Sequence, residues 1–130
     1  MKRNGFTVLE LVVVIVALSV GAWLFFTEKA TVMAVQRDTS RKTAINAMYY
    51  NLEEVFYEKN NYYPSAVDSK TLRAMDPSLF TDPNGVKLGD DGSDYRYDGT
   101  SCDTDGKCKA YTLRSTMERE GDYVKTNRNK

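Results

Sequence analysis

The segment from Phe6 to Phe26 constrains this chain most, because its twenty-one residues include only one charged side chain, Glu10. A helix rises about 1.5 Å per residue, so this segment matches the roughly 30 Å hydrocarbon core of a bilayer. Valine, isoleucine and threonine are frequent in it, but in lipid only a helix satisfies its own backbone. Lys2 and Arg3 precede the segment. They predict a single-pass precursor with a cytoplasmic N-terminus and an exported remainder.

Glu10 itself needs an explanation, because an unpaired carboxylate in a membrane is costly. One interpretation of the whole segment is an ordinary secretory signal peptide, with residues 17–19 (Ala-Leu-Ser) as a small-residue cleavage site, but Glu10 near the start of the segment argues against it. The other is cleavage between Gly5 and Phe6, which creates an α-amino group about one helical turn before Glu10. That amine would belong to the same chain or to a neighbouring copy. In the second case, the carboxylate sets the register at which a new subunit docks.

The sequence KRNGFTVLELVVV, residues 2–14, resembles the type III signal of type IV pilins and type II secretion pseudopilins. Residues 37–66 (RDTSRKTAINAMYYNLEEVFYEKNNYYPSA) are similar to the stretch where pilin-like helices end in an Asn/Gly-Tyr-Pro turn. The resemblance implies that Gly5 is the last leader residue, recognised by a prepilin peptidase. It further implies that Phe6 is the new, N-methylated N-terminus and that Glu10 is the assembly carboxylate.

The same resemblance implies an α+β pilin fold, in which a long N-terminal helix packs on an antiparallel sheet of about three strands. The expected parts are a cleaved leader (1–5), a hydrophobic half-helix (6–26), an amphipathic continuation (27–60) and a globular head (61–130). Many family members carry a proline in the second half of the apolar helix. Here Gly21 is the only helix breaker, so any local melting on assembly is expected near it.

Apolar residues continue the helical pattern beyond the membrane segment. Ile45, Met48, Tyr49, Leu52, Val55 and Phe56 form a stripe at helical spacing that predicts a packing face. The helix should end at Asn60-Asn61, since the residue before Pro64 avoids helical geometry. Between Gln36 and Thr43 there is no apolar residue, and the cations there (Arg37, Arg41 and Lys42) are interpreted as a solvated face.

Shorter elements are expected in the head. They are a helix at 69–75 before Asp76-Pro77, a turn at 82–85 (DPNG), and strands at 95–98, 109–115 and 123–126, with a frayed tail at 125–130. Cys102 and Cys108 flank an Asp-Gly turn and predict a disulfide, which the loop-entropy model values at about 2–3 kcal/mol. A disulfide places the head outside the reducing cytoplasm.

Composition narrows the function. Eighteen basic residues balance eighteen acidic ones, which argues against a direct nucleic-acid partner. The sequence has no histidine, so Ser-His-Asp and Cys-His catalysis are excluded. With no glycine-rich phosphate loop either, we do not expect an enzyme.

An acidic segment is the one departure from neutrality. From Asp82 to Asp105 there are seven acids against Lys87 and Arg96. The weak calcium candidates are Asp90, Asp91, Asp94 and Asp98. Their spacing does not match an EF-hand, so a solvated loop is the favoured interpretation and no cofactor is expected.

The expected function is that of a structural pilin subunit, exported to an extracellular pilus filament. The expected partners are identical subunits in a helical filament, the prepilin peptidase, the inner-membrane assembly platform, and the membrane before assembly. Within the family, a pseudopilin or a minor pilin is the alternative. Outside it, the alternatives are a single-pass membrane-anchored extracytoplasmic binding module and a small secreted domain released at Ser19.

Overall fold

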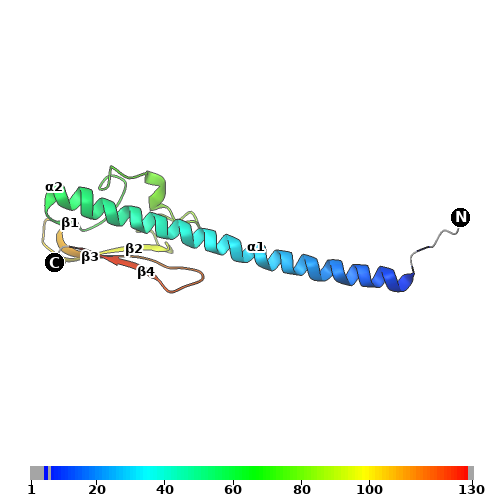
Figure 1. The fold of residues 1–130 in the computed structure, drawn as a ribbon. Coiled ribbons are helices and arrows are strands. Elements are labelled where there is room, and N and C mark those ends of the chain that lie inside the picture. Colours follow the sequence, from blue (N-terminus) through cyan, green and yellow to red (C-terminus); the bar gives the residue numbers. More distant parts are fainter. Residues whose placement is uncertain (1–4, 6, 129–130) are drawn as a thin grey trace. The chain divides into compact units, whose positions relative to one another are not determined.

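The computed structural model describes Gly5 and residues 7–128. The chain divides into two compact units, Met1–Ala34 and Val35–Lys130. In chain order the elements are α1 (Val8–Asn51), the π-helix η1 (Leu52–Tyr57), α2 (Glu58–Asn60), β1 (Tyr63–Pro64), the 3-10 helix η2 (Pro77–Phe80), β2 (Tyr95–Cys102), β3 (Lys107–Ser115) and β4 (Tyr123–Thr126) (Figure 1).

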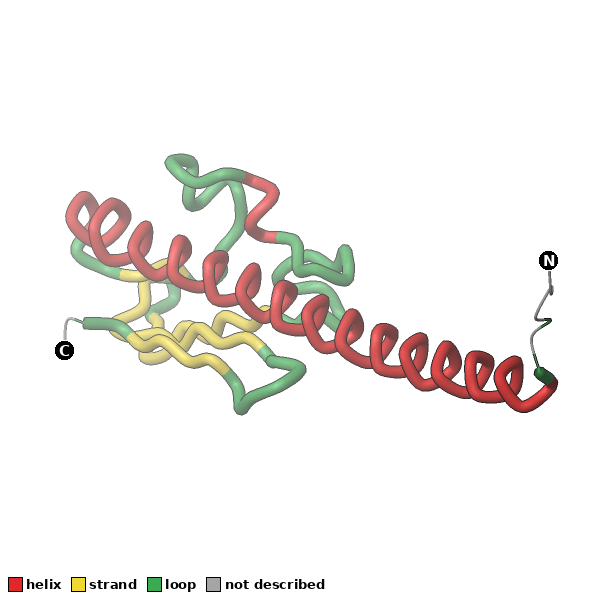
Figure 2. The backbone as a smooth tube through the Cα atoms, turned by 45° about the vertical axis from the view of Figure 1, so that its right-hand side comes forward, coloured by secondary structure: helices red, strands yellow, loops and turns green. Residues whose placement is uncertain are grey.

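The α+β fold class is confirmed: a long N-terminal helix packs on a small antiparallel sheet. Within the second unit, the packing face of α1 includes Ala44, Ile45 and Met48, which are at most 2% exposed. These side chains share a core with Tyr111 and Leu113 of β3. Figure 2 shows the strands running beside this part of the helix.

The π-helix η1 was not predicted, and it changes which residues face the core. Leu52 is buried as the stripe predicts, but Val55 and Phe56 are only half-buried, and Glu53 is 4% exposed instead. A wider helical turn breaks the 3.6-residue period on which the stripe was extrapolated. The predicted end is confirmed: α2 stops at Asn60, and Asn61 takes a left-handed conformation (φ 57°) that asparagine tolerates.

The sheet has β3 at its centre, in the order β1-β3-β2, with β4 also pairing with β3. All pairings are antiparallel, and they align Tyr95 with Ser115 and Tyr123 with Ser115 on either side of β3. The three predicted strands are present, and β2 and β3 are longer than predicted. The fourth, β1, is a two-residue strand that pairs Tyr63 with Cys108. It is too short to leave a periodic signal.

Two predictions for the head are wrong. The predicted helix at 69–75 is a series of turns, because the Asp68 carboxylate accepts hydrogen bonds from the amides of Lys70 and Thr71 at 2.9 and 2.7 Å. Such side-chain bonds compete with helical ones. The helix lies just beyond, at η2, where Asp76 caps it by accepting from the Ser78 amide at 2.9 Å.

The predicted frayed tail is also wrong for residues 125–128. Lys125 and Thr126 belong to β4, and the Asn127 side chain accepts from the Tyr111 amide at 3.4 Å. Arg128 contacts the helix through Glu54 at 2.8 Å and through the Tyr49 hydroxyl at 3.2 Å. Residues 129 and 130 lie outside the described residues. By contrast, the predicted turn at 82–85 is confirmed by a Gly85 amide to Asp82 carbonyl bond of 3.0 Å.

Candidate functional site

The first turn of α1 explains part of why Glu10 stands where it does. The Thr7 amide and hydroxyl both donate to Glu10 Oε2 at 3.3 Å, and the Glu10 amide donates to the Thr7 hydroxyl at 3.3 Å. This reciprocal pair is a capping box, which satisfies backbone donors that the helix leaves free. Its sequence signature, Thr-Val-Leu-Glu at residues 7–10, is present in the chain and is the signal by which this cap could have been predicted.

The capping box leaves one oxygen of Glu10 available. Within the described residues, the bonds drawn to this carboxylate all end on Oε2. The Oε1 atom can therefore accept from a further donor. Phe6, whose new α-amino group is the predicted partner, lies outside the described residues. Gly5 is described and exposed, with no other atoms near the position a Cβ would take.

The apolar part of α1 presents its side chains to the surroundings. In the first unit, Trp23, Phe25 and Phe26 are 66–69% exposed. No residue of the most apolar 18-residue stretch of the helix is buried. The described residues contain one helix long and apolar enough to cross a membrane. Leaving this much apolar surface in water is unfavourable, so the segment requires lipid or protein neighbours.

The small polar side chains of the apolar helix need no outside partner. The Ser19 hydroxyl donates to the Ile15 carbonyl at 2.8 Å, and the Thr27 hydroxyl donates to the Leu24 carbonyl at 2.8 Å. The helix continues through Gly21 without a break. Between Val8 and Phe26, Glu10 is thus the single group whose charge calls for compensation.

In the second unit, two charged side chains of the polar part of α1 are buried, while Gln36, Thr39, Ser40 and Thr43 are exposed. Arg41 is 2% exposed and Asp38 is 3% exposed, so the predicted solvated face is wrong for Arg41. The Arg41 guanidinium contacts Asp38 at 2.9 Å, Asp94 at 2.8 Å and Glu118 at 2.8 Å. We call these four residues the Arg41 cluster. It joins α1 to the loop before β2 and to the loop after β3.

Contacts in and around the Arg41 cluster lower the pKa of two of its acids, Glu118 and Asp38. Arg37 and then Arg41 donate to Glu118 and lower its pKa to about 2. Burial alone would raise the pKa of Asp38, but the backbone amides of Glu118 and Arg119 and the Arg41 guanidinium together lower it. Glu118 and Asp38 are therefore ionised at neutral pH. The cluster acts as a structural link between α1 and the two loops.

A second buried acid lies in η1. Glu53 accepts from the hydroxyls of Tyr63 at 3.1 Å and Tyr111 at 2.9 Å, and from the Arg128 amide at 3.2 Å. Burial, with a contribution from Glu53, raises the pKa of the Tyr111 phenol, which stays protonated and donating. The π-helix places this carboxylate where it ties the helix to β1, β3 and the C-terminal segment.

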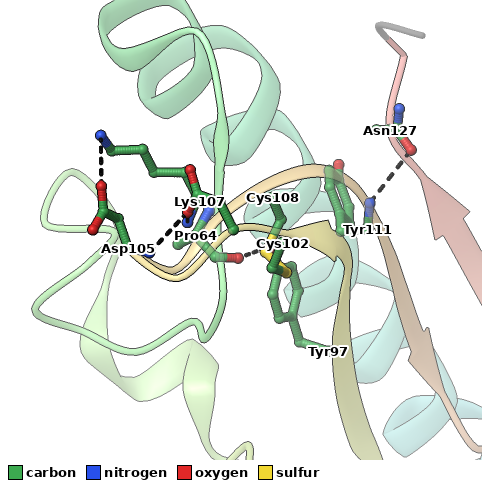
Figure 3. Close-up of a disulfide and its surroundings, with 9 residues drawn as sticks. Pro64, Tyr97, Cys102, Asp105, Lys107, Cys108, Tyr111 and Asn127 are labelled. Atoms are coloured by element: carbon green, nitrogen blue, oxygen red, sulfur yellow. Dashed lines mark hydrogen bonds and ion pairs between the residues drawn. A yellow bond between two sulfur atoms is a disulfide. The ribbon is translucent and has the colours of Figure 1, made fainter.

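The predicted disulfide between Cys102 and Cys108 is present and closes the β2–β3 hairpin (Figure 3). Beneath it, a Cβ added at Gly99 would lie 2.8 Å from Cys108 Sγ and 3.3 Å from the Pro64 carbonyl oxygen. Only glycine fits there. The Tyr97 hydroxyl donates to the same Pro64 carbonyl at 2.7 Å, which fixes β1 against the hairpin.

Among the described residues, the calcium candidates are not gathered into a group that could hold a metal ion, although Asp90, Asp91 and Asp98 line one cavity. The Asp94 carboxylate contacts Arg41 and accepts from the Asn84 amide group at 2.9 Å. Asp90 and Asp91 are exposed in the loop before β2, and Asp98 is exposed on β2 itself. Among residues 5 and 7–128, no group of three acidic, histidine or cysteine side chains is placed to hold a metal ion.

No family model, curated protein or solved structure matches this chain. The case for its function therefore rests on the signal-like N-terminal residues, the exposed apolar helix and the capped carboxylate.

Proposed function

We propose that this chain is a structural subunit of a filament of the type IV pilin kind. The observation that carries the proposal is the exposed apolar part of α1, residues 8–26. Its single charged side chain, Glu10, lies in the first turn of the helix, shortly after the Gly5-Phe6 junction. As a precursor, the helix sits in the membrane. After cleavage by a prepilin peptidase, it moves into the core of a filament through an inner-membrane assembly platform.

In assembly of this kind, the apolar side chains of the helix are covered in two successive environments. Lipid covers its side chains before assembly, and the helices of neighbouring copies cover them afterwards. Association is head to tail, which generates an open filament when the rotation between neighbouring copies does not close a ring. The disulfide and the Arg41 cluster support the proposal only indirectly, since they stabilise a small head suited to the extracellular surface.

In this proposal Glu10 has two roles. Oε2 belongs to the capping box of its own helix, and Oε1 accepts the α-amino group of Phe6, in the same or a neighbouring copy. A positive end buried among helices attracts a carboxylate strongly, because the surroundings have a low dielectric constant. The register of docking then follows from where the carboxylate meets the amine.

Two substitutions separate these roles. Glu10→Gln keeps an acceptor for the capping box but removes the charge. Thr7→Ala removes the cap but keeps the carboxylate. We expect Glu10→Gln and Glu10→Ala to be cleaved normally yet to give few filaments, whereas Thr7→Ala gives near-normal filaments. Filament yield is measured by shearing and electron microscopy. Normal filaments from Glu10→Gln, with loss in Thr7→Ala, would reduce Glu10 to a capping residue.

The intact mass and N-terminal sequence of the native protein test the processing step. A mature chain that begins at Phe6 and carries an added methyl group supports the proposal. A chain that begins at Met1 is a membrane-anchored module, and one that begins at Val20 is a secreted domain. If cleavage is normal, loss of protein secretion without loss of surface filaments on gene deletion would identify a pseudopilin.

A further inference from the structure

A groove in the second unit carries three unpaired cations. It lies between the end of the helix and the 70–74 loop, has a volume of about 710 Å³, and is lined by Lys59, Lys70 and Arg73 together with the half-buried Phe56. We call it the basic groove. All three cations are exposed, and within the described residues none of them forms an ion pair.

The shape of the basic groove is held by local bonds. Arg73 Nε donates to the Lys70 carbonyl at 3.1 Å, which keeps the two side chains adjacent. Two acids are close to these cations along the chain, Glu58 next to Lys59 and Asp68 two residues before Lys70, but neither lines the groove. The Asp68 carboxylate accepts from the amides of Lys70 and Thr71, and the charge of Lys70 helps to lower its pKa. The groove therefore offers concentrated positive charge beside an aromatic wall.

The same chain carries unpaired acids elsewhere. Of the seven acids between Asp82 and Asp105, four are already engaged. Asp82 and Asp103 accept from backbone amides, Asp94 contacts Arg41, and Asp105 pairs with Lys107 at 3.8 Å.

The remaining three acids are Asp90, Asp91 and Asp98, which we call the acidic patch. They are exposed and line a second cavity of about 290 Å³, with Arg96 as the one cation in its lining. The acidic patch and the basic groove share no lining residue. Each copy thus presents two separate, oppositely charged surfaces.

We propose that the basic groove of one copy receives the acidic patch of a neighbouring copy. The inference rests on the proposed filament function and names a contact between the globular heads of neighbouring copies within it. Two different surfaces on each identical copy make a heterologous contact, which propagates along a filament when the rotation between copies does not close a ring. Complementary exposed charges of this kind steer docking and fix register, while like charges in contact repel. An overall net charge of zero leaves no general repulsion between copies to overcome.

Charge reversal in the native cells tests the contact. One variant carries Lys59→Glu, Lys70→Glu and Arg73→Glu, a second carries Asp90→Lys, Asp91→Lys and Asp98→Lys, and a third carries all six changes. We expect each reversal alone to lower filament yield by about tenfold or more, because like charges then meet. The variant with all six substitutions should recover most of the yield, since both surfaces are then reversed on every copy and opposite charges meet again.

Exposed charges outside both surfaces serve as controls. Lys109→Glu and Asp122→Lys change charge at exposed positions that belong to neither surface, and they should leave the yield unchanged. The inference is overturned if both variants with three substitutions assemble normally. It is also overturned if the variant with six substitutions gives no higher filament yield than either of them.

Cross-linking separates this inference from the filament proposal. Full-length chains carrying Lys70→Cys are mixed in membranes with chains carrying Asp91→Cys and then oxidised, while the native cysteines remain paired with each other. We expect a mixed dimer that the pair Lys109→Cys and Asp91→Cys does not give. A mixed dimer without filaments would refute the filament and retain the contact. Filaments without the dimer would refute the contact alone.

Discussion

Replacing Arg41 by methionine should destabilise the head strongly. Arg41 is 2% exposed and contacts three carboxylates, of which Asp38 is itself 3% exposed. Breaking a buried ion pair by removing one partner costs about 3–5 kcal/mol, because the other charge stays buried. Methionine fills most of the volume of the lost side chain but offers no donor.

The expected loss of stability is smaller than the full cost of an unpaired buried charge, because the three acids keep other hydrogen-bond partners or reach water. Asp38 keeps two backbone donors, the amides of Glu118 and Arg119, at 3.0 and 3.1 Å. The side chains of Asp94 and Glu118 are 19% and 33% exposed, so water reaches both once Arg41 is gone. We therefore expect Arg41→Met to lower the free energy of unfolding by about 2–4 kcal/mol.

Urea unfolding of the full chain in detergent micelles measures this loss. All nine tyrosines lie in the second unit and Trp23 lies in the first, so in a Trp23→Phe background near-ultraviolet circular dichroism of tyrosine follows the second unit. With urea slopes of about 1–3 kcal/mol per molar, a loss of about 2–4 kcal/mol lowers the midpoint by about 0.7–4 M.

Lys42→Met is the matched control for Arg41→Met. Lys42 pairs with Glu120 at 2.6 Å, but the two side chains are 38% and 50% exposed, and exposed pairs contribute little. The reasoning is refuted if Arg41→Met shifts the urea midpoint no further than Lys42→Met does.

Three further predictions concern the head. Because the pKa of Glu118 is lowered to about 2, its stabilisation is complete above its ordinary pKa of 4.5 and is lost as the pH falls from 4.5 toward 2. Urea midpoints across that range should fall less steeply in Glu118→Gln, and an unchanged slope would contradict the assignment. Gly99→Ala should destabilise by about 1–3 kcal/mol, because the new methyl group meets the disulfide, while Gly121→Ala, in open space, should not. Equal midpoints for the two glycine variants would rule out this close approach. Tyr111→Phe should cost about 1–3 kcal/mol, since buried Glu53 loses a donor. A midpoint equal to that of the unmodified chain would show that Glu53 does not depend on Tyr111.

Much of the fold could be predicted because its signals are local. The helix stripe around Ile45 and Met48, the alternation along β3 and the closely spaced cysteines each reflect neighbours in the chain. The stop at Asn61 followed from the proline two residues after Tyr62. Each of these elements is encoded by residues close together in the sequence, so no knowledge of distant contacts is needed to predict it.

The buried charges could not be predicted in this way. Arg41 is buried because Asp94 and Glu118 come from loops 53 and 77 residues away, and no periodicity encodes such a meeting. Glu53 is buried because η1 departs from the 3.6-residue period of an α-helix. A prediction that extends one period along the whole helix cannot include this change. The capping box at Thr7 and Glu10 is different. Its signal was present in the sequence, and attention to the charge of Glu10 alone concealed its hydrogen-bonding role.

The π-helix has a consequence for how this head tolerates changes in length. Each turn of η1 holds more residues than an α-turn, so the segment Leu52–Tyr57 contains surplus chain relative to a regular helix. Removing one residue there would let the segment close into a regular α-helix, and the shorter segment would turn through nearly the same angle, so the parts of the helix before and after it would keep their phase. The cost of the deletion would fall inside the segment, where Leu52 and Glu53 face the core. The rest of the helix should therefore tolerate the loss of one residue here better than a loss elsewhere along α1.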